Sequence, residues 1–488
     1  MRAGPALGHL ASMLVCASAV AVAQAQPRVV TDEVDPAQFS AAPEADVPKP
    51  WGVRVIAGPE WQPSRNLADG VAWRSAIDLR QVFALGAVWR VLLAKRLEST
   101  HRPHGVHHST HALREAYVTR AANAHWFVDI GRVNVRSGVG LGYNPTDWLR
   151  GSVLATPANQ NPASARENRL GAFMLRMQHV TDSGSMHFAY APQLTSDAAA
   201  PMRSWGLNVA RGNAGHAFQW RWAPRVTETL SLDVMALART GQPFEVGANL
   251  SAVITPSVVA HAEVSVARRP RPGPEGGPIH KGFAPRAALG LSWTLPTGAT
   301  LGVEYQHAAD ALSGADWDRL RRREDPAALR AIGAWRSERA RTQDPLLRSG
   351  WFARFQWNDV LRDGRYDLGA FVRLNPHDKS RLWQISGAWH VTPAFSLRLI
   401  TFGVQGGLNT EYGGRAVAHY GWIGGGRFFC FWARNGGRGG GFGLTPGFAG
   451  IRTASFVVPL SDTPLTEVGC NADAQGAPTA FRFGSARA

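Results

Sequence analysis

The stretch LREAYVTRAANAHWFVDIGRVNVRSGVGLGYNPTDWLRG, from Leu113 to Gly151, joins two strand-like runs to a polar, glycine-rich turn. The runs 113–120 and 125–135 are rich in aromatic and β-branched residues, and Ala-Ala-Asn-Ala at 121–124 separates them. This order predicts a strand, a turn and a second strand. Asn144-Pro145-Thr146-Asp147 has the composition of a tight turn, so we expect a loop of defined conformation after the second strand.

The loop contains three glycines at alternate positions, Gly138, Gly140 and Gly142. Their spacing is not that of a dinucleotide-binding loop, and no strand–helix context surrounds them. We therefore expect a conformational role, in which the glycines let the backbone turn tightly. Gly142, Asn144, Pro145 and Asp147 form the predicted turn, and Asp147 could also cap a short helical turn over 148–150.

Apolar and polar residues alternate with period two along most of the chain. In Trp73–Arg80 the apolar residues fall on one face and the charged residues on the other, which indicates a half-buried strand. The pattern recurs in the runs 218–222, 230–236, 301–306, 351–358, 365–373 and 383–390. We count roughly 16–18 strands of about 9–11 residues.

A soluble β-sandwich would alternate in the same way, so the positions of the aromatic residues decide between the two folds. Tryptophans stand at both ends of apolar faces, as in the pairs Trp351/Trp357 and Trp383/Trp389. Short connections also alternate with long ones. Both features favour an all-β fold, a transmembrane antiparallel β-barrel with short periplasmic turns and long outer loops.

The two ends of the chain differ from this pattern. Residues 1–25 read as a secretory signal peptide, 26–50 as a flexible segment, 51–429 as the barrel and 430–488 as a glycine-rich, disordered tail. Cys430 and Cys470 could pair in an oxidising envelope. Export from the cytosol makes nucleic-acid binding a poor explanation for 52 Lys+Arg against 36 Asp+Glu.

Three short motifs resemble a broad group of Gram-negative outer-membrane β-barrels that includes porin-like and alginate-export-like proteins. They are Leu113-Arg-Glu-Ala-Tyr117, Asp129-Ile-Gly-Arg132 and Gly142-Tyr-Asn-Pro-Thr-Asp147. The resemblance implies an outer-membrane location, contact with membrane lipid, passive passage of a solute and an oligomer as one option. Such barrels usually end in an aromatic residue, whereas this chain ends in Ala488.

The polar strand faces carry more arginine than acid, which favours an anionic solute, either an acidic polysaccharide or a small anion. The alternative is that these charges pair across the lumen and stiffen the wall. Arg132 and Arg136, beside the glycine loop, could touch solute or neutralise Glu115 and Asp129. The expected pore-lining residues are Arg74, Arg80, Arg132, Arg136, Arg221, Arg354, Arg365 and Arg373.

Two other functions stay open, namely a barrel that anchors a surface polymer or partner protein, and a lipid-modifying enzyme. The sequence contains no G-x-S-x-G, H-E-x-x-H or P-loop motif, although barrel hydrolases assemble their residues from separate strands. We expect no enzyme and no cofactor.

Two connections have unusual composition. His101–His111 contains five histidines, of which His104, His107 and His108 are weak metal-ligand candidates in what is otherwise a solvated loop. The second connection, Ala308–Ser349, has helical composition over 327–341, with acidic residues early and arginine late. It could fold inward as a constriction, cover the mouth, or form a charged surface helix.

Overall fold

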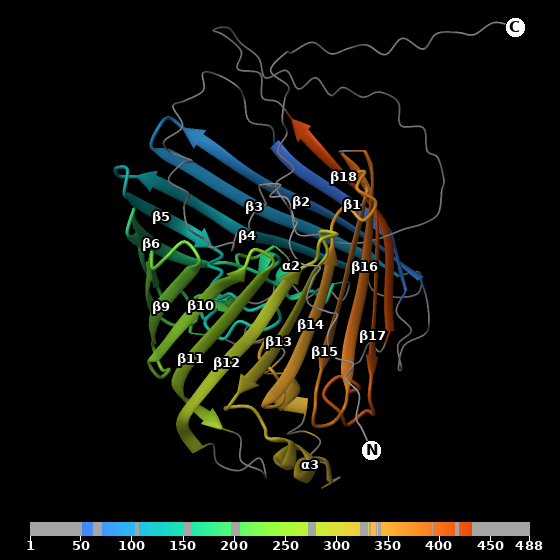
Figure 1. Ribbon diagram of the computed structural model, residues 1–488. Helices are drawn as coiled ribbons and strands as arrows, with labels where there is room; N and C mark the ends of the chain where they lie inside the picture. The colour runs from blue at the N-terminus through green and yellow to red at the C-terminus, as the bar shows by residue number, and fades with distance from the viewer. Residues whose placement is uncertain are drawn as a thin grey trace, which may run out of the picture.

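The computed structural model describes residues 51–61, 71–102, 107–150, 159–196, 205–271, 280–322, 330, 333–337, 339, 343–392, 394–414 and 419–431. Its strands form one antiparallel sheet of 18 strands, and the pairing of the first strand with the last closes the sheet into a barrel (Figure 1). The all-β barrel prediction is confirmed. The predicted signal peptide, flexible segment and most of the tail lie outside the described residues, and so does Cys470.

Each strand pairs with its neighbours in the chain. The strands are β1 (Trp51–Trp61), β2 (Val71–Leu85), β3 (Trp89–His101), β4 (His108–Ala121), β5 (Trp126–Val133), β6 (Ala172–Thr181), β7 (Gly184–Ala191), β8 (Ala217–Pro224), β9 (Leu230–Arg239), β10 (Glu245–Thr255), β11 (Val258–Arg271), β12 (His280–Thr294), β13 (Thr300–Ala308), β14 (Ser349–Trp357), β15 (Tyr366–Leu374), β16 (Arg381–Thr392), β17 (Phe395–Gln405) and β18 (His419–Phe431). Short helices are α2 (Pro162–Glu167), η1 (Val209–Arg211) and α3 (Gly314–Arg322). None of the described helices has the length and apolarity needed to cross a membrane.

The two faces of the wall differ in chemistry, as the period-two pattern predicts. On β2, Trp73 and Ile77 are exposed on the outside, whereas Arg74 and Asp78 are buried inside. Other strands repeat this arrangement, and the outside carries a belt of exposed apolar side chains. The belt includes Trp73, Ile77, Ile130, Leu175, Met177, Phe218, Trp222, Val246, Leu250, Val264, Leu289, Leu291, Trp293, Leu301, Val303, Trp351, Leu368, Ile385 and Trp389. A soluble barrel would not expose so much contiguous apolar surface.

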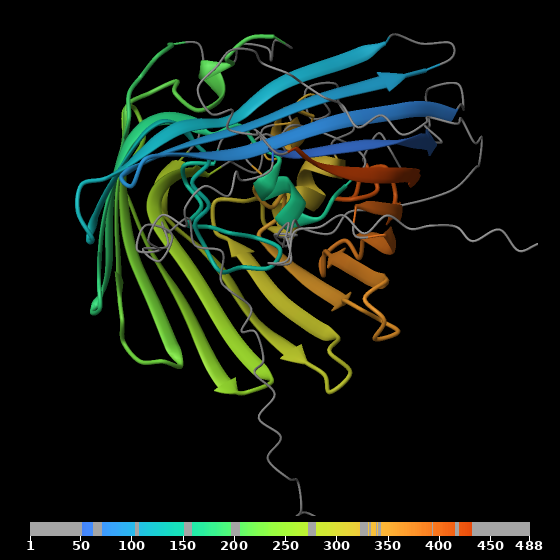
Figure 2. The same ribbon diagram turned by 90° about the horizontal axis from the view of Figure 1, so that it is seen from above.

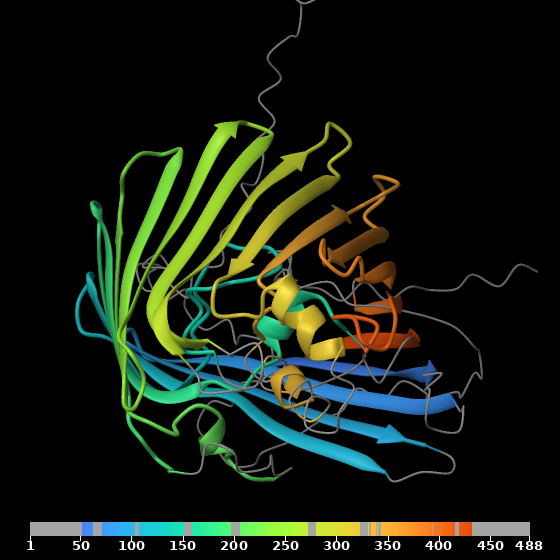
Figure 3. The same cartoon turned by 90° about the horizontal axis from the view of Figure 1, so that it is seen from below.

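Tight turns gather at one end of the barrel and long connections at the other. The shortest of the tight turns include 256–257, and the longest spans 358–365. The long connections include 134–171, which carries α2, and 309–348, which carries α3. Figure 1 shows α3 at this end, whereas α2 lies at mid-height, and both helices fall within the ring of strands in Figures 2 and 3. The long connections therefore partly fill the barrel.

Candidate functional site

The connection after β5 crosses the barrel interior, and its residues 134–150 form what we call the inner loop. Two fully buried carboxylates on the opposite wall accept hydrogen bonds from its backbone N–H groups. Glu263 on β11 accepts hydrogen bonds from the N–H groups of Val139, Gly140 and Thr146, at 2.9, 3.0 and 2.7 Å. The Thr146 hydroxyl donates to the same carboxylate at 2.8 Å.

Glu304 on β13 receives the next section of the loop. It accepts from the N–H groups of Leu141, Gly142 and Tyr143, the last two at 3.1 and 3.0 Å. Consecutive N–H groups that converge on an anion form a strong, charge-assisted site. The two carboxylates therefore fix the position of the inner loop within the barrel.

Glycine is required in the inner loop because the backbone approaches the wall closely. A Cβ atom on Gly142 would lie 2.5 Å from both Gln306 Nε2 and Phe352 Cγ. Gly138 adopts φ +94°, and a Cβ there would lie 2.5 Å from a carboxylate oxygen of Glu263. The close contacts at Gly138 and Gly142 are therefore consistent with the conformational role expected for these glycines.

Asp147 closes the inner loop through a buried ion pair. Arg169, just after α2, donates to both of its oxygens at 2.6 and 3.0 Å, and the Ser137 N–H donates at 3.2 Å. Burial by itself would raise the pKa of Asp147, but Arg169 and Arg166 outweigh it, so this pKa lies below its usual value. The predicted helical turn at 148–150 does not form, and the Asp147 carboxylate instead accepts from Arg169 and the Ser137 N–H.

The other residues of the predicted turn are buried with Asp147. Asn144 accepts from Arg166 Nη1 at 3.3 Å through its side chain, and its carbonyl accepts the Asp147 N–H at 3.2 Å. Pro145 lies between them and is also buried. The turn predicted from Asn-Pro-Thr-Asp therefore forms inside the barrel.

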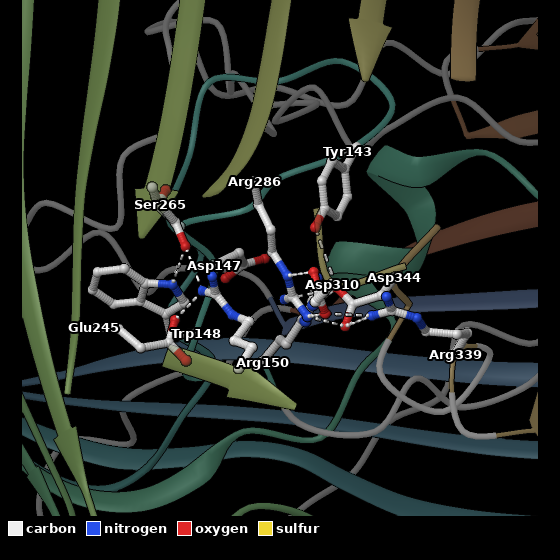
Figure 4. Close-up of polar contacts among 12 residues, drawn as sticks. Tyr143, Asp147, Trp148, Arg150, Glu245, Ser265, Arg286, Asp310, Arg339 and Asp344 are labelled. Atoms are coloured by element: carbon white, nitrogen blue, oxygen red, sulfur yellow. Dashed lines mark hydrogen bonds and ion pairs between the residues drawn. The ribbon is translucent and has the colours of Figure 1, made fainter. Parts of the chain in front are cut away.

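A second charge cluster fastens the inner loop to the β13–β14 connection (Figure 4). Arg286 on β12 donates to Asp310 at 2.9 and 2.7 Å and to Asp344 at 3.1 and 3.0 Å. Arg150, at the end of the inner loop, also donates to Asp344, and Arg339 pairs with Asp310 at 2.9 Å. The described part of the β13–β14 connection is thus tied to the inner loop and to the wall.

The helical prediction for this connection holds where it can be compared. Residues 333–337 are helical, within the predicted stretch 327–341. The helix α3 was not predicted. Its sequence signal was an N-cap, Ser313, followed three residues later by Asp316. In the structure the Ser313 hydroxyl accepts the Asp316 N–H at 3.2 Å.

Three of the predicted pore-lining arginines are ion-paired on the inner face of the wall. Arg74 pairs with Glu98 at 2.7 Å, Arg80 with Glu115 at 2.6 Å, and Arg221 with Asp233 at 2.9 Å. These pairs match the alternative in which charges stiffen the wall. By contrast, Arg354 donates to Gln356 at 3.2 Å and Arg373 to the Gly142 carbonyl at 3.0 Å, so the hydrogen bonds of these two arginines go to neutral acceptors.

The remaining three predicted arginines lie elsewhere. Arg132 shares the outer face of β5 with the exposed Ile130, so it does not line the lumen. Arg365 is exposed in the tight turn before β15, and Arg136 belongs to the inner loop. For Arg132 and Arg136, contact with solute and neutralisation of Glu115 and Asp129 were the two alternatives. Arg132 does not neutralise either acid, because it bonds to backbone carbonyls. Arg80 pairs with Glu115 and Arg176 with Asp129.

The histidine-rich connection is only partly described, and His104 lies outside the described residues. His107 Nδ1 approaches His101 Nδ1 at 2.7 Å, and His108 Nε2 approaches the Thr110 hydroxyl at 3.1 Å. Within the described ranges, no three side chains of ligand type come together as a metal site would require.

Sequence reasoning missed Glu263, Arg169 and Asp344, which hold the inner loop. The alternation in the run 301–306 placed Glu304 on the polar face but did not indicate that it binds the loop. Glu263 lies at an inward position of an alternating run, Val-Ala-His-Ala-Glu-Val-Ser-Val at 259–266, and a lone acid in such a run was the available signal. No local signal shows that its partner is a loop more than a hundred residues away.

Comparison with known proteins gives structural similarity only. No protein-family model and no curated protein matches the chain. OpdQ of Pseudomonas aeruginosa aligns with 78% of this chain and 97% of its own at 9% identity and a TM-score of 0.45. The outer membrane protein OprD of the same species aligns with 78% and 93% at 8% identity and a TM-score of 0.45. OccK5 (OpdH), also from Pseudomonas aeruginosa, aligns with 79% and 99% at 9% identity and a TM-score of 0.46.

Proposed function

We propose that this protein is a channel of the Gram-negative outer membrane through which a small anionic solute passes passively. The observation that carries the proposal is the closed wall of 18 strands, apolar outside and charged inside. Barrels of about 16–18 strands are wide enough to leave an aqueous passage. An apolar belt on the outside matches the hydrocarbon of a bilayer.

The inner loop supports a small solute in preference to a polymer. It crosses the interior at Glu263 and Glu304 and is joined to the β13–β14 connection through Asp344. Two connections tied together inside the barrel narrow the passage. A narrower passage favours a small ion over a bulkier polysaccharide chain.

Arg354 and Arg373 support the anionic preference. They lie on diagonal inward positions of β14 and β15. Among the residues that the structure describes, they donate to Gln356 and to the Gly142 carbonyl, and no carboxylate is bonded to either guanidinium. Guanidinium groups in a water-filled constriction raise the local anion concentration. The ion-paired Arg74, Arg80 and Arg221 contribute little net field.

Reversal potentials in planar bilayers under a KCl gradient test the proposal. We expect the native channel to favour chloride, and the double variant Arg354→Gln/Arg373→Gln to lower the chloride-to-potassium permeability ratio by on the order of twofold. The matched control is Arg221→Gln/Asp233→Asn, which removes a guanidinium without changing the net charge and should leave the ratio unchanged.

Two results would count against the proposal. Equal shifts in both double variants would mean that Arg354 and Arg373 do not set selectivity. Folded protein without stepwise conductance would favour the anchor or the enzyme. Block by an acidic oligosaccharide, in the same bilayers, would favour the polysaccharide over the small anion.

A further inference from the structure

The connection between β7 and β8 folds over the outside of the barrel instead of into it. Figures 2 and 3 show η1 outside the ring of strands, next to β4–β6. Arg132, on the outer face of β5, donates to the Leu113 carbonyl at 2.9 Å and to the Leu207 carbonyl. A guanidinium on the outer face thus joins this connection to the wall.

Two further contacts hold the connection there. Trp205 stacks on His111 with ring centroids 4.1 Å apart, and His111 faces outward because its neighbour Ala112 is buried inside. The Asn213 side chain exchanges hydrogen bonds with the backbone N–H and carbonyl of Phe173, both at 2.8 Å. The segment is therefore docked on the wall through several built contacts.

Its docked position nevertheless leaves large apolar side chains uncovered. Trp205 is 79% exposed and Leu207 is 55% exposed. Leu207 meets Arg132, two residues after the exposed Ile130 of the apolar belt, and Trp205 meets His111 near the long-connection end of β4. The segment therefore continues the face that we assign to the membrane, at the level where tryptophan is enriched in membrane proteins.

A positive charge accompanies this apolar surface. Lys95 on β3 faces outward, because the flanking Ala94 and Arg96 are buried inside, and its strand partner Leu113 is two residues from His111. Side chains in this diagonal relation lie about 7–8 Å apart. No acidic residue occurs on the outer face of β3–β6 or in 192–196 and 205–216, among the residues that the structure describes.

We propose that Trp205, Leu207, His111 and Lys95 form a lipid-docking surface for the outer leaflet. Acyl chains pack against Trp205 and Leu207, and an anionic phosphate headgroup lies at Lys95. The inference rests on the membrane location given under the proposed function. Continuity with the apolar belt and the sign of the charge both select a lipid of this kind.

Fluorescence quenching in lipid vesicles tests the surface. The chain with Cys16→Ser, Cys430→Ser and Cys470→Ser receives one cysteine, at Leu207, Ile130 or Val226, labelled with an environment-sensitive fluorophore. Nitroxide-bearing phosphatidylcholine quenches from the lipid and iodide from water. We expect Leu207 and Ile130 to be quenched by lipid, and Val226, exposed in a tight turn, by iodide.

The headgroup is tested by adding phosphatidylglycerol to the vesicles. Lipid quenching at position 207 should rise on the order of twofold, Lys95→Gln should abolish the rise, and Lys379→Gln, an exposed turn lysine, should preserve it. Equal quenching in both vesicles would overturn the headgroup contact.

The label at Ile130 separates failure of this inference from failure of the membrane barrel. Iodide access at position 207 with lipid access at position 130 would place the segment in water and overturn the docking surface alone. Iodide access at both positions would overturn the membrane location and the docking surface with it.

Discussion

Asp147 and Arg169 show what a single buried pair contributes to this barrel. Both side chains are almost fully buried, and Arg169 also donates to the Val135 carbonyl and to Asn134. The guanidinium therefore joins both arms of the inner loop to the segment after α2. Because both charges are buried, loss of one partner leaves the other uncompensated, so the pair is more sensitive to substitution than a surface pair.

Replacing Asp147 with Asn should destabilise the protein by about 3–5 kcal/mol, because it leaves the Arg169 charge buried without its anion. Urea unfolding in lipid vesicles measures the change. The control is Arg319→Gln, whose exposed side chain pairs with Asp316 one turn earlier on α3, and which should cost about 0–1 kcal/mol. Similar costs for the two variants would contradict the importance of the buried pair.

The same pair predicts a pH dependence. The pKa of Asp147 is lowered in the folded protein, so its stabilisation is complete above the unfolded value of about 3.9 and is lost as pH falls through the folded value. The difference in unfolding free energy between native protein and Asp147→Asn should therefore be constant near neutral pH and shrink below about pH 4. A difference independent of pH down to full acid unfolding would be inconsistent with this assignment.

At the scale of elements, the inner loop is held by two strands that lie more than a hundred residues after it in the sequence. Glu263 on β11 and Glu304 on β13 accept hydrogen bonds from its N–H groups. The loop therefore has a defined position although it contains no regular secondary structure. The loop therefore crosses the barrel in a fixed position, and we expect loss of either wall carboxylate to loosen it.

Glu304→Gln should increase the fluctuations of the open-channel current, because the amide replaces one acceptor oxygen by a donor that faces the N–H groups of Gly142 and Tyr143. Single-channel recordings measure this noise. Glu98→Gln is the control, since Glu98 pairs with Arg74 and Arg96 on the wall. Noise that rises equally in both variants would reflect general loosening of the barrel.

Gly142→Ala should displace the inner loop and change the unitary conductance, because the new Cβ would lie 2.5 Å from Phe352 Cγ. Overpacking of this kind costs about 1–3 kcal/mol. Gly350→Ala is the matched control, since its Cβ would meet its nearest neighbour, the Leu374 carbonyl oxygen, at 3.7 Å. A native conductance in Gly142→Ala would mean that the loop does not bound the passage.

At the scale of the whole molecule, the apolar belt is the feature that commits the barrel to a bilayer. Leu291 on β12 is 54% exposed within this belt, and Leu361 is 65% exposed in the tight turn after β14. Their exposure is similar, but only Leu291 would face hydrocarbon. Exposure alone therefore does not predict the effect of a charge at the two sites.

Leu291→Arg should destabilise the folded protein in vesicles by about 2–4 kcal/mol, whereas Leu361→Arg should cost about 0–1 kcal/mol. The unfolding free energy of each variant is measured once in vesicles and once in detergent. Equal costs at the two positions would mean that Leu291 does not face the bilayer, and the membrane location would fail with it.

Much of this architecture follows from the sequence. Alternation in runs such as Trp73–Arg80 is a local property, because successive side chains of any strand point to opposite faces. The barrel, its tight turns and the loop after β5 could therefore be predicted. The same rule places Arg132 on the face of Ile130, so its outward position was also within reach of the sequence.

The tertiary structure decides the partners. Glu263 lies more than a hundred residues from the loop N–H groups that it accepts, and Asp344 lies as far from Arg150. Such contacts depend on how the sheet closes and on which connections enter it, and no short-range pattern encodes either. The sequence determined which residues face inward, while closure of the barrel decided which charges are neutralised by an opposite charge and which bond to neutral groups.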